Sequence, residues 1–381
     1  MNQLLLEEGL ARFYAPRAEI VSKQMGVFYN PAMKLNRDVT IEVLKALKLR
    51  SITACDLLAA SGVRTIRMVK ELPAETFKII YANDADEDAF ELIKRNLQLN
   101  LIQYDELKEW KRSEEVKGSV AVINSEANML LNQSSGFDYI DIDPFGSPNP
   151  FLDSAVRRIS RGGILAITAT DTAPLSGTYE KTCLRKYWAT PLRNAFMHET
   201  GLRILIRKAQ LVAAQYGRAL VPIFSYYNLH YFRAFLRCEK GKKKADSIIR
   251  EHKILLHCPK CLKTEVSEQH SAKERCECGS ELKIIGPLYV GAIWDGELLK
   301  NLKSLEIVET IKKEAEINVP FFYSIPELCS RLKTAAPKKS AIIEELRRIG
   351  FKASETHFDP EGMRTDASPE MIKEAIKNLE K

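Results

Sequence analysis

The sequence predicts an α/β protein in which a doubly wound parallel sheet is followed by a smaller α+β domain. Strand-like and helix-like segments alternate from about residue 39 to residue 240, which is typical of such a sheet. The chain has 381 residues, more than one hydrophobic core usually serves. After a lysine run at 242–244 the alternation of strands and helices ends, and a cysteine cluster and then a helical, charged stretch follow. We therefore expect one domain over 1–240 and a second over 241–381.

The elements of the first domain follow from hydrophobic periodicity and turn residues. Segments 60–72 and 87–101 carry apolar residues at helical spacing, and 147–160 is a helix that begins with prolines. Residues 221–238 are β-branched and aromatic, which favours an antiparallel pair of strands at an edge of the sheet. The strands of the parallel sheet are expected over 48–58, 77–86, 118–127, 137–146 and 162–172.

The second domain divides into two parts. Residues 254–286 hold a cluster of cysteines. Residues 287–381 are helical and charged, and their pattern is similar to a small helical or winged-helix module.

The composition excludes a membrane protein. No stretch approaches the roughly 18–20 uninterrupted apolar residues that a membrane-spanning helix needs. Glu7 and Glu8 directly follow three leucines, unlike a secretory signal, which begins with basic residues. We therefore expect a soluble, cytoplasmic protein.

Positive charge exceeds negative charge only mildly. The chain has 57 Lys and Arg against 50 Asp and Glu, a net charge of +7. Positive charge gathers in 207–218, in 237–246, and at Lys181, Arg185 and Lys186. Such runs are usually solvated faces, so a nucleic-acid partner and a plain charged surface both stay open on charge alone.

Acidic residues stand at the predicted ends of four successive strands. They are Asp56, Asp84, Glu126 and Asp143. Because ligands of parallel sheets bind beyond the carboxyl ends of the strands, we expect these acids to line one crevice. For each acid taken alone, a helix N-cap is an equal alternative.

The turn after the first strand indicates which cofactor the crevice accepts. A dinucleotide-binding loop needs several glycines where its backbone approaches a pyrophosphate, but segment 56–65 offers only Gly62. S-adenosylmethionine has no phosphate and needs less close approach. We predict that Asp84, 22 positions after Gly62, accepts hydrogen bonds from the ribose hydroxyls. Glu126 and the small Ala127 are predicted to meet the adenine.

The Asp-Pro-Phe-Gly sequence at 143–146 suggests the reaction. An exocyclic amine of a nucleobase is a poor nucleophile because its lone pair is delocalised into the ring. A carboxylate at Asp143 that accepts its N–H hydrogens favours a pyramidal nitrogen and can take up the departing proton. Pro144 fixes the backbone, and Phe145 offers a flipped base a face for stacking. The alternative is an ordinary turn, since Asp-Pro is common in turns.

With these motifs the chain resembles the tRNA guanine-26 N2-dimethyltransferase family, which belongs to the Rossmann-like class I S-adenosylmethionine-dependent RNA methyltransferases. The likeness runs through nearly the whole length. It is carried by VFYNPAMKLNRD (27–38), DLLAASGVRTIR (56–67), YANDAD (81–86), FDYIDIDPFGSP (137–148), TATDTAPLSG (168–177) and THFDPEGMRTDAS (356–368).

The resemblance implies two successive methyl transfers to the N2 amine of guanosine 26 in tRNA. It implies that Asp143 is the catalytic acceptor and that Pro144 and Phe145 shape the base pocket. It also implies that Arg37 and Arg67 reach the carboxylate end of the cofactor. The predicted cofactor-binding set is therefore Arg37, Asp56, Gly62, Arg67, Asp84, Glu126 and Ala127.

We expect the domain over 1–240 to be the S-adenosylmethionine-dependent methyltransferase domain and the domain over 241–381 to bind tRNA. In the second domain, four clustered cysteines predict a structural metal site. Cys258 and Cys261 form a C-x-x-C pair, and Cys276 and Cys278 follow after 14 residues as a C-x-C pair. Zinc is the expected ion, although the second pair is one residue shorter than in a zinc ribbon. A vestigial site and a disulfide are the alternatives.

Three functions stay open from the residues. The first is methyl transfer to a tRNA guanine amine. The second is an adenine-amino methyltransferase acting on DNA or RNA, because motifs of the Asp-Pro-Phe type also serve that chemistry. The third is a tRNA-binding scaffold without catalysis. A monomer without an obligate protein partner is the default expectation.

Overall fold

The structure is a computed structural model that describes residues 3–16, 29–112, 115–303 and 305–379. Its residues group into two compact units that alternate along the chain. The first unit comprises Met1–Thr170, Val212–Phe224 and Arg233–Ala245, and the second comprises Asp171–Leu211, Ser225–Phe232 and Asp246–Lys381. The single boundary near residue 240 stays a prediction.

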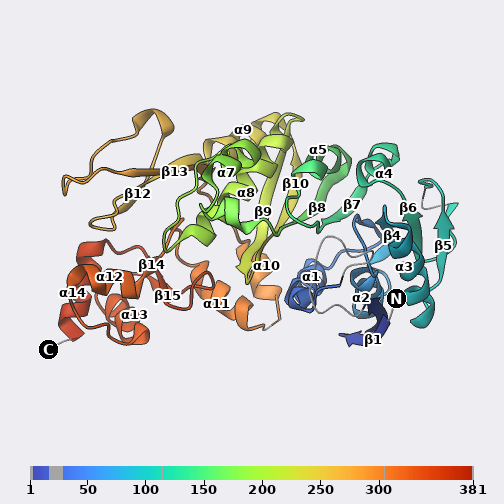
Figure 1. The fold of residues 1–381 in the computed structure, drawn as a ribbon, viewed down its shortest axis with the longest axis horizontal. Helices are drawn as coiled ribbons and strands as arrows, with labels where there is room; N and C mark the ends of the chain where they lie inside the picture. The colour runs from blue at the N-terminus through green and yellow to red at the C-terminus, as the bar shows by residue number, and fades with distance from the viewer. Residues whose placement is uncertain (1–2, 17–28, 113–114, 304, 380–381) are drawn as a thin grey trace. The chain divides into compact units, whose positions relative to one another are not determined.

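An eight-stranded sheet carries the candidate site (Figure 1). Its order is β5-β6-β4-β3-β7-β8-β10-β9. Strands β5, β6, β4, β3, β7 and β8 pair in parallel, so the predicted doubly wound parallel sheet is confirmed. The strands are β3 (Ile52–Asp56), β4 (Phe77–Asp84), β5 (Tyr104–Leu107), β6 (Val120–Asn124), β7 (Phe137–Ile142), β8 (Ile159–Ala169), β9 (Arg218–Asn228) and β10 (Tyr231–Lys240).

The helices of the first unit begin and end where local signals predict. Asp86 caps α3 by accepting the backbone N–H of Ala89 at 3.1 Å, and α5 begins directly after Pro148. The predicted helices 60–72, 87–101 and 147–160 are confirmed, each shortened by no more than three residues at either end. The helices are α1 (Lys34–Leu47), α2 (Val63–Glu71), α3 (Glu87–Leu99), α4 (Ala127–Gln133) and α5 (Asn149–Arg158).

The core of this unit lies between the sheet and its helices. Val120, Val122 and Ile123 of β6 have no exposed surface, as expected of a parallel strand covered on both faces. At the sheet edge, β9 and β10 are joined by only two residues, which requires an antiparallel hairpin and confirms the pair predicted over 221–238.

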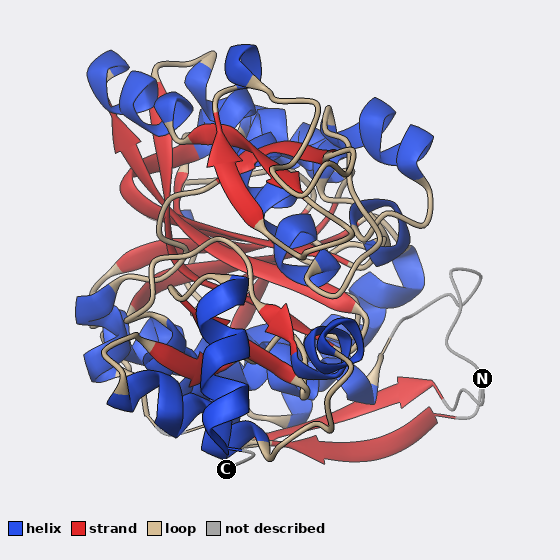
Figure 2. Cartoon of the chain, turned by 90° about the vertical axis from the view of Figure 1, so that its left-hand side faces the viewer, coloured by secondary structure: helices blue, strands red, loops and turns tan. Residues whose placement is uncertain are grey.

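Two strand features of the first unit have no clear sequence pattern. Strand β5 is short and polar, and it is recognised only by its pairing with β6. Strands β1 (Gln3–Glu8) and β2 (Ala11–Pro16) form a separate antiparallel hairpin, the pair of long red arrows at the lower right of Figure 2. Leu4 and Leu5 of β1 are exposed, so the strand lacks the alternation that marks a half-buried strand.

The second unit is mixed α+β, which confirms the predicted class of the C-terminal part. It contains two three-stranded antiparallel sheets, β12-β11-β13 and β14-β16-β15. The strands are β11 (His252–His257), β12 (Thr264–Ser267), β13 (Lys283–Tyr289), β14 (Tyr323–Ser324), β15 (Ala353–Glu355) and β16 (Gly362–Thr365). The remaining helices are α6 (Thr172–Leu175), α7 (Glu180–Tyr187), α8 (Met197–Ala214), α9 (Lys242–Arg250), α10 (Gly296–Asn301), α11 (Glu306–Glu314), α12 (Ile325–Leu332), α13 (Lys339–Arg348) and α14 (Pro369–Leu379).

A buried ionic cluster ties the elements of the second unit together. Arg364 of β16 is fully buried, and it pairs with Glu199 of α8 at 2.7 Å and with Glu314 of α11 at 3.2 Å. Within the described part of the chain, no helix has the length and apolar character that a membrane span requires.

Candidate active site

The carboxyl ends of four neighbouring parallel strands carry the predicted acids. Asp56 and Asp84 are the last residues of β3 and β4, Glu126 follows β6, and Asp143 follows β7. Because these strands are neighbours in the order β6-β4-β3-β7, the acids share one edge of the sheet. The chain adds strands on opposite sides of β3, so the point between β3 and β7 is a topological switch point, where open α/β sheets bind ligands.

Asp143 is held by a buried arginine. Its carboxylate forms an ion pair with Arg64 of α2. Arg64 also donates to Asn36 Oδ1 at 3.0 Å and to Thr40 Oγ1 at 3.1 Å, so its guanidinium is fixed on several sides. The Asp143 side chain keeps 16% of its surface exposed. The fold therefore orients this carboxylate and leaves it open to a substrate.

Asp141, two residues before Asp143, is the centre of a buried ionic network. Arg233 of β10 donates to both carboxylate oxygens of Asp141, at 2.9 and 2.7 Å, and the Tyr139 hydroxyl donates at 2.5 Å. Burial by itself would raise the pKa of Asp141, but Arg233 and Arg64 hold that pKa below its ordinary value. Asp141 stays ionised and anchors Arg64, which in turn orients Asp143.

Pro144 and Phe145 follow Asp143 in the turn after β7. Pro144 is buried, whereas 42% of the Phe145 side chain is exposed. Gly146 donates its N–H to Thr170 Oγ1 at 2.7 Å and accepts the Thr170 N–H at 2.9 Å, which ties the turn to the end of β8. An accessible aromatic ring follows a fixed carboxylate, and this combination can stack a base and accept hydrogens from its amine.

The turn after β3 is tight around Gly62. Gly62 has φ +75°, and a Cβ at this position would lie 3.3 Å from Ile93, so both conformation and space favour glycine. Asp56 is 2% exposed and accepts a hydrogen bond from the Thr65 hydroxyl at 2.8 Å. Burial raises the pKa of Asp56 to about 7. Asp56 supports the turn from within, and its direct contact with a cofactor stays a prediction.

Asp84 and Glu126 both accept backbone hydrogen bonds. Asp84 accepts the N–H of Ala60 at 2.9 Å and of Asp86 at 3.1 Å, and burial raises its pKa. Glu126 caps α4 by accepting a backbone N–H of the first turn at 2.9 Å, and the buried Ala127 is the first helical residue. Each carboxylate oxygen has further acceptor capacity, so both acids can still bind a ligand.

Arg37 and Arg67, which the family resemblance assigns to the cofactor, meet at Glu8. Arg37 donates to both carboxylate oxygens of Glu8, at 2.7 and 2.6 Å, and Arg67 donates to Oε1 at 2.8 Å. Arg67 also pairs with Glu71 and Asp38, each at 2.7 Å. The two arginines thus join α1 and α2 to the β1–β2 hairpin, and their cofactor contact stays a prediction. Val27 and Phe28 of the same family motif lie outside the described residues.

The four clustered cysteines converge in the second unit. Their Sγ atoms all lie within 4.8 Å of one another, with Cys258 to Cys278 at 3.4 Å and Cys261 to Cys276 at 3.5 Å. All four are free thiols, so the disulfide alternative is not seen. The group can hold a metal ion. His257, the residue before Cys258, forms a hydrogen bond with the Thr264 hydroxyl, at 2.9 Å.

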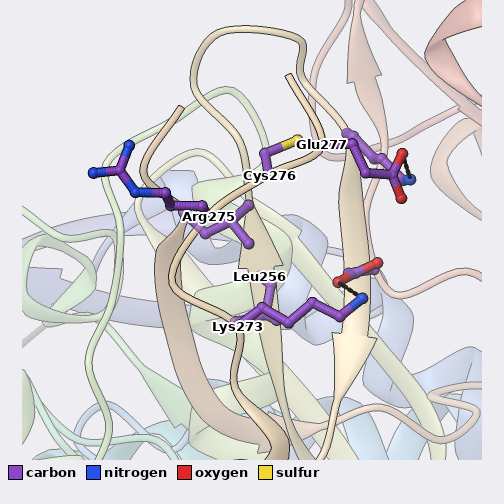
Figure 3. Close-up of a pocket in the computed structure, with 8 residues that line it drawn as sticks. Leu256, Lys273, Arg275, Cys276 and Glu277 are labelled. Carbon is purple, nitrogen blue, oxygen red and sulfur yellow. Dashed lines mark hydrogen bonds and ion pairs between the residues drawn. The ribbon is translucent and has the colours of Figure 1, made fainter. Parts of the chain in front are cut away.

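A pocket lies beside this cluster (Figure 3). Leu256, Lys273, Arg275 and Cys276 line it, and the Arg275 side chain points away from the Cys276 sulfur. Lys273 pairs with Glu265 at 3.5 Å, as the dashed line in Figure 3 shows. Lys263 and Glu277, which also line the pocket, form a second ion pair. Because the charged groups of the pocket are largely paired with one another, we assign the pocket no ligand.

Comparison with known proteins identifies the family. A family model described as N2,N2-dimethylguanosine tRNA methyltransferase matches residues 9–377. The chain belongs to this family. The match runs from the turn before β2 into α14 and so extends over both units, and the dimethylguanosine methyltransferase family accounts for the second unit as well as for the sheet.

Individual family members agree over nearly the full length. The chain is 39% identical to the tRNA (guanine(26)-N(2)/guanine(27)-N(2))-dimethyltransferase of Aquifex aeolicus, over 98% of this chain and 96% of the relative. It is also 39% identical to the tRNA (guanine(26)-N(2))-dimethyltransferase of Pyrococcus abyssi, over 96% of each. The solved structure of Trm1 from Pyrococcus horikoshii, a complex with S-adenosyl-L-methionine, has TM-score 0.85 and 35% identity over 98% of this chain and 99% of that chain.

Sequence reasoning missed Arg64, Arg233 and Glu8. Arg64 had a local signal, because it lies in the first turn of α2, where a cation opposes the helix dipole and therefore needs a specific partner. Arg233 and Glu8 had none. Arg233 is 92 residues from Asp141, and Glu8 is 29 residues from Arg37, so only the folded chain brings these pairs together.

Glu8 is expected to make stability depend on pH. Burial would raise its pKa, but Arg37 and Arg67 lower the pKa of Glu8 to about 2 from an ordinary value of 4.5. A depressed pKa contributes stability above pH 4.5 that is lost as pH falls toward 2. Between pH 6 and pH 3 the wild-type chain should lose about 2 kcal/mol more unfolding free energy than Glu8→Gln. Urea titrations at both pH values measure this difference, and equal losses would contradict it.

Proposed function

We propose that this chain transfers methyl groups from S-adenosylmethionine to the N2 amine of guanosine 26 in tRNA and forms N2,N2-dimethylguanosine. The observation that carries the proposal is the Asp143 carboxylate, oriented by Arg64 at the end of β7 and followed by the exposed ring of Phe145. Membership of the dimethylguanosine methyltransferase family supports the choice of a tRNA guanine over an adenine amine.

The edge of the sheet where the parallel strands end fits a cofactor that lacks phosphates. Gly62 is the single glycine of its turn, and Asp84 would hold the ribose. Glu126 and Ala127 would meet the adenine at the start of α4. Asn128 Oδ1 is buried and has no hydrogen-bond partner among the described residues, so an amino group such as that of adenine would satisfy it. When bound, the cofactor supplies an electrophilic methyl group.

The chain's own residues provide orientation and a proton acceptor. Phe145 stacks on the guanine, which removes the base from its neighbours and presents the amine at the end of β7. Asp143 accepts an N–H hydrogen bond, which favours a pyramidal nitrogen with its lone pair free. As the new N–C bond forms, the bond between the methyl group and the cofactor's sulfur would break and leave the neutral thioether, and the nitrogen would lose one proton to Asp143, whose exposed side passes it to solvent. The second transfer uses the same acceptor for the remaining N–H.

Nucleoside analysis tests this proposal. The protein is incubated with labelled S-adenosylmethionine and tRNA transcripts, which are then digested and separated. We expect dimethylguanosine, and we expect its loss from a transcript with adenine at position 26. The Aquifex aeolicus relative is named for positions 26 and 27. The transcript with adenine 26 therefore keeps guanine 27, so that any dimethylguanosine it still yields would report methylation at position 27. Methyladenosine would support the adenine alternative, and no product would support the scaffold.

We further propose that Cys258, Cys261, Cys276 and Cys278 hold a structural zinc ion. Tetrahedral zinc with Zn–S bonds of about 2.3 Å separates its sulfurs by roughly 3.8 Å, close to the distances in this cluster. The shorter C-x-C pair does not prevent the four thiols from converging.

The free state of all the described cysteines supports a reducing compartment, and we propose that the chain is a cytoplasmic protein. We also propose that it is a monomer.

Metal analysis tests the zinc site. The purified wild-type chain should hold about one zinc per chain, and Cys258→Ser/Cys261→Ser should hold almost none and melt several degrees lower, because metal binding contributes directly to folding. Cys329→Ala, a buried cysteine outside the cluster, is the control and should keep its zinc. A metal-free chain whose melting temperature zinc does not raise would contradict the site.

A further inference from the structure

Helix α7 presents an outward face that combines cations with apolar surface. Lys181, Leu184 and Arg185 are spaced i, i+3 and i+4, so they share one face of the helix, and Trp188 directly follows its last residue. All four are exposed, Leu184 by 55% and Trp188 by 47%. No carboxylate of the described residues pairs with Lys181, and Arg185 donates only to the Thr182 hydroxyl within the same helix, at 3.2 Å. This face therefore has positive charge that no described acid neutralises.

Two more cations, from α8, lie against Trp188, which directly follows α7. The Lys208 ammonium lies 2.9 Å from the centroid of the Trp188 ring, and Arg207 Nη1 donates to the Trp188 carbonyl at 3.1 Å. Lys208 is only 7% exposed, and Arg207 Nε is buried without a hydrogen-bond partner in the described part of the chain. No described carboxylate pairs with either cation.

Burial and the positive charge of Arg207 lower the pKa of two neighbouring groups. Burial, and then the neighbouring Arg207 charge, lower the pKa of Lys208 to about 8. Burial and the same Arg207 charge lower the pKa of His252 in β11 to about 3, so His252 adds no charge at neutral pH. Buried charges are normally paired because an unpaired one is costly. An anion supplied from outside the chain would offset this cost.

We propose that the outward face of α7, together with Arg207 and Lys208, binds the sugar–phosphate backbone of the tRNA substrate. This inference rests on the proposed function. Lys181 and Arg185 neutralise phosphates, and Trp188 packs on a ribose or an unstacked base. The charge of the face decides the choice of partner, because cations without acids complement a polyanion, whereas the core of a protein interface is depleted in charge.

Charge reversal at the exposed positions tests the surface. In Lys181→Glu/Arg185→Glu, affinity for a fluorescent tRNA, measured by anisotropy, should fall about 10- to 100-fold, and the slope of log affinity against log salt should decrease by about 2. Trp188→Ala should lower affinity roughly tenfold with an unchanged salt slope, because stacking releases no counterions. Calorimetric affinity for S-adenosylmethionine should stay at the wild-type value in every variant.

The matched control is Lys373→Glu/Lys377→Glu in α14. These two lysines are exposed and spaced i, i+4, like Lys181 and Arg185, and their reversal changes the net charge equally. The control should bind tRNA as the wild type does. If it loses as much affinity as the α7 variant, or if the α7 variant keeps wild-type affinity and salt slope, the inference is wrong. Failure of the proposed function is distinct, since the wild type would then form no dimethylguanosine.

Discussion

Asp143→Asn should lower kcat for dimethylguanosine formation by roughly 10²- to 10⁴-fold, the range that general-base and electrostatic contributions usually cover. The amide is nearly the same size as the carboxylate but cannot take up the proton that leaves the amine. Arg64 loses one of its two charged partners but keeps Asp141, at 3.5 Å, and its contacts with Asn36 and Thr40, so the fold should survive. Single-turnover assays with tRNA measure the rate.

Cofactor affinity separates a catalytic defect from a folding defect. Calorimetry should show that Asp143→Asn binds S-adenosylhomocysteine within a few-fold of wild type, because Asp143 is not among the predicted cofactor-binding residues. Asp153→Asn in α5, an exposed acid ten residues further on, is the matched control and should keep the wild-type rate. A wild-type rate in Asp143→Asn would remove this residue from the catalytic role, and lost cofactor binding would indicate damage to the fold.

Arg233→Met should have the largest effect on stability. Arg233 is completely buried and holds both oxygens of Asp141. Removing one member of a buried ion pair leaves an uncompensated charge, which typically costs about 3–5 kcal/mol of unfolding free energy. Urea titrations measure the loss. Arg237→Met, an arginine of the same strand that is only partly buried, should cost far less.

A double variant tests the reason for this loss. If the cost arises from the abandoned charge, Asp141→Asn/Arg233→Met should recover part of the stability that Arg233→Met loses, because no unpaired carboxylate remains. If the double variant instead loses, relative to wild type, the full sum of the two single losses of unfolding free energy, the two residues are not coupled as the structure indicates.

Local patterns alone determined much of this protein. The alternation of strands and helices predicted the parallel sheet, and strand ends placed Asp84, Glu126 and Asp143 at one edge of it. The spacing of four cysteines predicted a cluster that the second unit assembles. These features depend on residues close in sequence, where periodicity, caps and turns operate, and on the rule that parallel strands end at the same edge.

Tertiary structure alone decided how the charged side chains are paired. Arg233 reaches Asp141 across 92 residues, Glu8 gathers two arginines from separate helices, and Lys208 lies against the ring that ends α7. No local pattern encodes such pairs, because burial and strand order set which charges meet. For the same reason only the folded chain shows that Asp143 is held by Arg64, and that the cations of α7 and α8 remain without an acid among the described residues.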